Sequence, residues 1–158
     1  MSSIPSCGTS ANASDTEQAL LALAEGILRG RLERQGSIGN PADAIDYLRL
    51  RLGVLEHEEF HVLWLDNRHQ ILECQRLFTG TIDGAAVYPR EVVRAALAVN
   101  ASAAILAHNH PSGIAEPSAA DRAITKELRE ALRLIGVRVL DHIIVGSDCV
   151  SMASSGLF

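Results

Sequence analysis

Two histidines and one aspartate are the residues of this chain whose types and spacing could bind a metal ion. They lie in the stretch HNHPSGIAEPSAAD, residues 108–121, as His108, His110 and Asp121. In an extended segment residues i and i+2 point to one face, so the two imidazoles would face one way and Asn109 the other. Three protein ligands with one open position are typical of catalytic rather than structural zinc sites. The stretch therefore predicts one zinc ion per chain.

A strand and a helix must position these three side chains. The apolar run ASAAILA, residues 101–107, predicts a strand buried on both faces that runs directly into His108. A loop rich in Pro, Ser and Gly then turns the chain, and Ser118 is expected to begin a helix with Asp121 in its first turn. The end of the strand and the start of the helix would thus meet at one point. Ser118 and Asp121 also fit a capping box, which stabilises a helix start without any metal.

The remaining sequence predicts helices packed around a mixed sheet. Apolar spacing and capping residues indicate helices over 15–34, 40–53, 90–100 and 118–136. Short apolar runs between turn residues indicate strands over 59–66, 70–78, 101–107, 137–146 and 149–153. The apolar residues at helical spacing are Leu20, Ala24, Ile27 and Leu28 in the first helix, and Val93, Ala96 and Leu97 in the third. This order of elements predicts an α/β domain.

Composition narrows the class of protein. The chain has 158 residues, 47% of them hydrophobic, which is enough for one domain with its own core. Its three cysteines (Cys7, Cys74 and Cys149) are scattered, which is typical of a reducing compartment. We find neither a membrane-spanning run nor a secretory leader, and therefore expect a soluble cytoplasmic protein without a membrane partner. Residues 1–14 are small, polar and uncharged apart from the amino terminus, and we expect them to be disordered or loosely attached.

The charge balance bears on partners. Fourteen basic residues stand against nineteen acidic ones, a net charge of −5, so nucleic-acid binding through this chain alone is not expected. A local basic patch is compatible with that balance. The sequence indicates no particular oligomeric state.

The motif H-x-H-x10-D, with a serine three residues before the aspartate, resembles the JAMM (MPN+) metallopeptidase motif. The strings HNHPSG, PREVVRAAL and DHIIVG are similar to the RadC family, over about residues 55–158. The resemblance implies a JAMM/MPN domain over 41–158, with a cytidine-deaminase-like mixed β-sheet flanked by helices, after an N-terminal tail and helix over 1–40. Full-length RadC proteins also carry a region related to helix-hairpin-helix DNA-binding modules. We recognise no such hairpin here, so the chain is similar to a short RadC-type protein.

The resemblance also implies roles for the site residues. His108, His110 and Asp121 match the family's zinc ligands. Ser118 matches the serine that helps to stabilise the oxygen of the tetrahedral intermediate. The implied activity is that of a zinc metallopeptidase, in which a metal-activated water attacks a peptide or isopeptide bond of a peptide or protein substrate that the sequence does not identify.

The family further requires an upstream glutamate that binds the water on the metal. The segment EHEEF offers Glu56, Glu58 and Glu59. In RadC proteins this glutamate stands two residues before a phenylalanine, which selects Glu58, two residues before Phe60. If the segment is extended, Glu59 faces away from both Glu58 and Glu56.

Three other functions were weighed. The HNH nuclease motif spreads its residues over a larger module, so the tripeptide match is a coincidence. A 2-His-1-carboxylate iron site has the same ligand types, and metal analysis would distinguish it from zinc. A non-catalytic DNA-repair or protein-interaction module is the third alternative.

We expect His142, in DHIIVG, either to have a structural role or to support a metal ligand without binding the metal itself.

Overall fold

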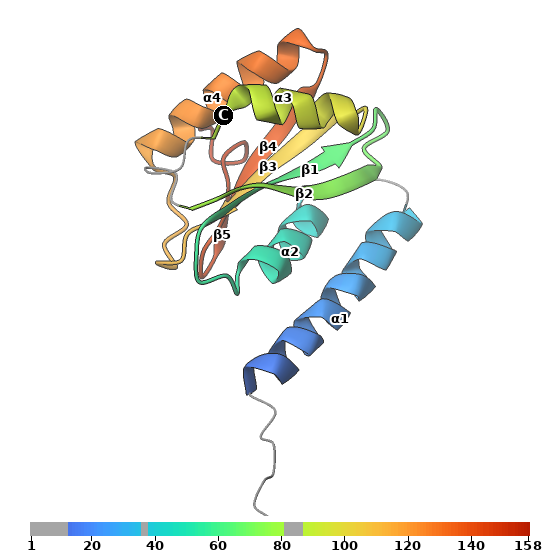
Figure 1. The fold of residues 1–158 in the computed structure, drawn as a ribbon, viewed down its shortest axis with the longest axis vertical. Coiled ribbons are helices and arrows are strands. Elements are labelled where there is room, and N and C mark those ends of the chain that lie inside the picture. The colour runs from blue at the N-terminus through green and yellow to red at the C-terminus, as the bar shows by residue number, and fades with distance from the viewer. Residues whose placement is uncertain (1–12, 36–37, 81–86) are drawn as a thin grey trace, which may run out of the picture.

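A five-stranded mixed sheet forms the centre of the protein (Figure 1). The computed structural model describes residues 13–35, 38–80 and 87–158, and the statements below concern those residues. The strand order is β2-β1-β3-β4-β5. Only β3 and β4 run parallel, whereas the other neighbouring pairs are antiparallel. The strands are β1 (Glu59–Leu65), β2 (Ile71–Thr79), β3 (Ala103–Asn109), β4 (Arg138–Val145) and β5 (Cys149–Ser151).

Four helices flank the sheet, and each follows capping or apolar signals in the sequence. They are α1 (Ala13–Gln35), α2 (Pro41–Leu52), α3 (Pro89–Ala98) and α4 (Ala119–Leu134). Helix α2 begins as predicted, because Asn40 accepts a hydrogen bond from the backbone N–H of Asp43 and Pro41 occupies the first turn. This is a mixed α/β architecture with helices on a five-stranded sheet, and the predicted fold class is confirmed.

Alternation of side chains divides the core into two layers. Odd-numbered residues of β1 and β3, such as Leu63 and Ile105, pack against α2. Even-numbered residues, such as Trp64 and Leu106, pack against α3 and α4 on the other face. Both strands are buried along their whole length, as predicted for β3. The even-numbered face is the one that carries His108.

The apolar faces of two helices differ from their predictions. In α3 the buried residues are Val92, Ala95 and Ala96, whereas Leu97 is 61% exposed. Several apolar residues are adjacent in this helix, so the sequence pattern does not decide which face is buried. Two faces that differ by one residue are separated by roughly 100° around the helix axis. In α1 the predicted helix is present, but Leu20 is exposed, because the helix meets the domain through other residues.

Helix α1 contacts the domain along one side. Leu28 packs against the cluster beneath α2, and the carboxylate of Glu25 accepts a hydrogen bond from Arg51 at 2.6 Å. Ile27, by contrast, is 48% exposed. Our expectation for residues 1–14 falls mainly outside the described residues, although Ala13 already belongs to α1. None of the described helices combines the length and the apolar character needed to cross a lipid bilayer.

Candidate metal centre

The two histidines of the motif converge at the end of β3. His108 is fully buried, and its Nε2 lies 2.9 Å from Nε2 of His110. Asn109 points to the opposite face of the sheet, where it bonds the start of β1. This is the arrangement expected of an extended segment, in which alternate side chains share a face. Phe60 lies opposite His108 in the strand register, and the two rings are stacked with centroids 6.4 Å apart.

Asp121 reaches both histidines while it also caps α4. Its two carboxylate oxygens lie 3.2 Å from Nε2 of His108 and 3.5 Å from Nε2 of His110. The capping box is complete: Ser118 Oγ accepts from the Asp121 N–H, and Asp121 accepts from the Ser118 N–H. Burial acts to raise the pKa of Asp121, but hydrogen bonds from His108 and Ser118 and the charge of His108 outweigh it and hold that pKa below its ordinary value. The cap therefore positions a carboxylate that stays ionised.

A chain of buried hydrogen bonds fixes where His108 carries its proton. The backbone carbonyl of Asp121 can only accept, so the Thr125 hydroxyl donates to it. Thr125 Oγ1 then accepts from Nδ1–H of His142, at 2.6 Å. Burial lowers the pKa of His142 well below its ordinary value, so the ring is neutral and its Nε2 is an acceptor. That Nε2 accepts from Nδ1–H of His108 at 2.8 Å, so Nε2 is the nitrogen of His108 that faces Asp121 and that carries the lone pair when the ring is neutral.

The proton of His110 is fixed in a similar way by the loop that follows it. Its Nδ1–H donates to the backbone carbonyl of Ile114 at 2.7 Å, so Nε2 is again the nitrogen left to bind a metal. This loop folds closely over the end of β4: a Cβ on Gly146 would lie 2.5 Å from the carbonyl oxygen of Gly113. A backbone bond from the His110 N–H to the Val145 carbonyl, at 2.8 Å, ties the two segments together.

The site therefore brings the Nε2 atoms of the two rings, 2.9 Å apart, beside an ionised carboxylate. When both rings are neutral, these atoms carry lone pairs, and a cation between them would be attracted by all three groups. The donor set of two nitrogens and one carboxylate suits zinc. Among the described residues, one further group joins these histidines: a carboxylate oxygen of Glu58 and the ligand nitrogens of His108 and His110 lie within 4.8 Å of one another, so these three residues could also hold a metal ion.

Of the three glutamates considered for the site, the structure brings Glu58 to it. Glu56 is exposed. Glu59 is buried on the other face, where its carboxylate accepts hydrogen bonds from His61 at 2.7 Å and from Arg76 at 3.1 Å. Burial acts to raise the pKa of Glu59, but these bonds and one from a further histidine lower it overall. The difference between Glu58 and Glu59 follows from the alternation of side chains along an extended segment.

Comparison with known proteins agrees with this geometry. Residues 38–157 match the family described as the RadC-like JAB domain. The chain belongs to this RadC-like JAB family. It is 51% identical over 141 residues to a UPF0758 protein of Marinobacter nauticus, a match that covers 89% of this chain and 63% of the relative.

Other relatives differ in length. A UPF0758 protein of Thioalkalivibrio sulfidiphilus is 53% identical, again over 63% of its own length. A UPF0758 protein of Vibrio cholerae is 51% identical, and the match covers 89% of both chains. This RadC-like chain thus spans less than two thirds of the first two relatives, and these names state no activity.

Two residues that support this RadC-like site, Asn109 and Thr125, were not assigned a supporting role from the sequence motif. The sequence predicted only that Asn109 faces away from the site. Its side-chain amide accepts from the Glu59 N–H at 2.8 Å and donates to the His57 carbonyl at 2.9 Å. The Glu58 carbonyl accepts from the Gly80 N–H at 2.8 Å, so the backbone on both sides of this glutamate is held. The second is Thr125, whose helical position four residues after Asp121 was the available hint.

Proposed function

We propose that this chain is a zinc-dependent hydrolase of the JAMM type that cleaves an amide bond in a peptide or protein. The observation that carries the proposal is the convergence of the Nε2 atoms of two imidazoles beside an ionised carboxylate, while Nδ1–H of each ring is bonded away from the site. The two imidazoles and the carboxylate are therefore already positioned to bind a cation. Membership of the RadC-like JAB family supports the same reading.

His108, His110 and Asp121 would hold the metal. A bound zinc ion would supply Lewis acidity, lowering the pKa of a water toward about 7 and polarising a substrate carbonyl. Asp121 is assigned as the third ligand because its carboxylate already contacts both rings and is held by the helix cap. Glu58, on the same face, is left for proton transfer.

Glu58 would take the proton from the attacking water and return it to the leaving amine. General acid–base groups of this kind contribute about 10²–10⁴-fold to the rate. Ser118 would act on the carbonyl oxygen as it gains negative charge. The cap uses a lone pair of Ser118 Oγ and leaves its hydroxyl hydrogen to donate. Loss of one such donor costs roughly 10²–10³-fold in rate.

Metal content is the first test. Protein purified without chelators is expected to contain one zinc per chain by elemental analysis, and Asp121→Asn and His110→Ala to lose it. Iron in place of zinc would favour the 2-His-1-carboxylate alternative. Absence of metal, together with failure to bind added zinc, would refute the site.

The second test separates the two carboxylates. Glu58→Gln is expected to retain zinc and to lose about 10²-fold or more of its activity on a peptide panel, as for a missing general base. Glu56→Gln is the matched control, because that exposed glutamate lies two residues earlier and should leave both properties unchanged. Loss of zinc in Glu58→Gln would instead make Glu58 a ligand, and full activity would refute its role as base.

A further inference from the structure

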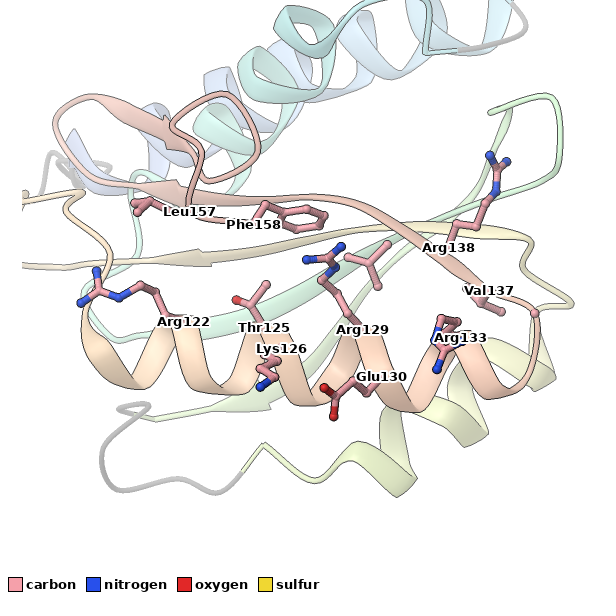
Figure 2. Close-up of a pocket in the computed structure, with 12 residues that line it drawn as sticks. Arg122, Thr125, Lys126, Arg129, Glu130, Arg133, Val137, Arg138, Leu157 and Phe158 are labelled. Atoms are coloured by element: carbon pink, nitrogen blue, oxygen red, sulfur yellow. The ribbon is translucent and has the colours of Figure 1, made fainter.

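A groove of about 720 Å³ runs between α4 and β4, on the edge of the domain (Figure 2). The apolar residues of its lining include Val137, Val139 and Leu157. Phe158 lies beside the middle of α4, with the guanidinium of Arg129 4.1 Å from the centre of its ring (Figure 2). The groove shares Thr125 with the hydrogen-bond chain behind the candidate metal centre, but no step of the proposed hydrolysis uses the groove.

A row of basic side chains borders the groove. Arg122, Lys126, Arg129 and Arg133 follow one another at intervals of four, three and four residues along one face of α4 (Figure 2). Arg138 of β4 also lines the groove, but its side chain points away from α4 and its guanidinium lies 3.5 Å from the ring of His69. We call the four residues of α4 the basic row. Residues three and four apart share a helix face, which explains the alignment.

The charge of the basic row is not neutralised within the domain. Among the described residues none of the four forms an ion pair, and Glu130 is the acidic side chain in the groove lining. The side chains of α4 that line the groove thus carry four cations and one carboxylate, a net of +3 in a chain whose net charge is −5, so the remaining side chains carry −8. Like charges gathered in this way repel one another, and an anionic partner would relieve that repulsion.

The strand beside the groove has an open edge. Strand β5 pairs with β4 at Ile143, Ile144 and Val145. In the described part of the chain, no strand pairs with residues 138–140 of β4 on the side away from β3. An open edge of this kind is a template for adding an extended segment, with main-chain hydrogen bonds giving affinity.

We propose that this groove binds an extended acidic peptide segment of a partner protein, added as a strand beside β4 with its carboxylates against the basic row. Alternate side chains of a strand are about 6.6 Å apart, and steps of three or four residues along a helix rise about 4.5–6 Å. Acidic residues at every second position would therefore meet successive members of the row. The residues between them would point to the other face of the sheet.

A peptide is favoured over a single-stranded nucleic acid, because the aromatic ring in the groove lining is already covered by another side chain. Base stacking on an exposed aromatic ring is a main source of affinity for single strands. The aromatic residue that lines the groove is Phe158, and Arg129 already covers a face of its ring. The acidic remainder of the chain also repels a long phosphate backbone.

Binding can be tested with the full chain and without metal, so failure here is distinguishable from failure of the proposed hydrolase. The probe is a fluorescein-labelled octapeptide of alternating Glu and Val, followed by fluorescence anisotropy. We expect saturable binding that Lys126→Glu/Arg133→Glu weakens at least tenfold, because the double change takes the net charge of the α4 side chains in the lining from +3 to −1. Both side chains are exposed, and circular dichroism would verify folding.

Matched controls separate this site from general charge attraction. Arg68→Glu/Arg90→Glu makes the same charge change outside the groove and should alter the dissociation constant less than twofold. The same octapeptide with every second amide N-methylated keeps its carboxylates but cannot donate those main-chain hydrogen bonds, and should bind at least tenfold more weakly. Absence of saturable binding, equal weakening by both double variants, or equal binding of the N-methylated peptide would overturn the proposal. So would a thymidine 12-mer that binds more tightly than the octapeptide.

Discussion

Replacing His142 by leucine tests whether the proton on His108 is set from behind the metal centre. His142 is fully buried and lies between His108, at 2.8 Å, and Thr125, at 2.6 Å. Leucine fills much of the same space but neither donates nor accepts. The Nδ1–H of His108 would then be a buried donor without its partner, which costs about 1–3 kcal/mol. His108 could also move its proton to Nε2, the atom that should bind metal.

The expected effect is a loss of zinc affinity rather than a loss of fold. Residues behind a metal-binding histidine typically contribute 10–100-fold to metal affinity, which corresponds to about 1.4–2.7 kcal/mol. Zinc affinity would be measured by competition with a chromophoric chelator at pH 7.5, and folding by the melting temperature of the zinc-free protein. Thr125→Val leaves the bond between the two histidines in place, so its loss of affinity should be smaller.

His61→Leu is the matched control for removing a buried histidine. His61 is 3% exposed and bonds Glu59 on the opposite face of the sheet. This change should lower the melting temperature while zinc affinity stays within twofold of the unaltered protein. If His142→Leu also bound zinc within twofold, the proton of His108 would not be set through His142, and the deduced direction of the hydrogen bonds would be wrong.

Three further predictions follow from the same contacts. Asn109→Ala should retain zinc but reduce hydrolysis at least tenfold on whichever peptide the panel identifies, because the backbone beside Glu58 loses its amide partner; unchanged activity would refute this. Gly146→Ala should lower the melting temperature by several degrees, since its Cβ would collide with the loop after His110; an unchanged melting temperature would contradict it. Burial lowers the pKa of His61 and His142, so below about pH 6.5 the unfolded chain binds protons that the folded chain does not. The melting temperature of zinc-free protein should therefore fall between pH 7 and pH 5, and a rise would exclude this cause.

Those parts of the fold that depend on local signals were predictable from the sequence. The run before His108 is apolar throughout and became the buried strand β3, and Gly136, with φ of 77°, ends the last helix region as predicted. The faces of the helices were less predictable, because tertiary packing decides them. In α3 several apolar residues are adjacent, so the sequence allows more than one buried face, and the structure buries Val92 rather than Leu97.

In the candidate site, too, the residues that are close in sequence were predictable and those that are distant were not. Spacing alone predicted that His108, His110 and Asp121 would meet, because they lie at the two ends of one short loop. The support given by His142 could not be predicted in this way, since it is 34 residues from His108 in the chain. It depends on the parallel register of β3 and β4, in which Leu106 lies opposite His142. Register between distant strands is a property of the folded sheet, and a single sequence does not state it.

Register also decides which glutamate reaches the metal centre, and the middle residue of the HNH tripeptide controls it. A slip of one residue between β1 and β3 would exchange the faces of Glu58 and Glu59. The regular pairing of these strands ends with Phe60 opposite His108, so the backbone ladder does not extend to Glu58. The side-chain amide of Asn109 replaces the next rung, since it accepts from the Glu59 N–H as a backbone carbonyl would and donates beyond it. Asn109 therefore fixes the face on which Glu58 lies, between the two histidines that are the proposed metal ligands.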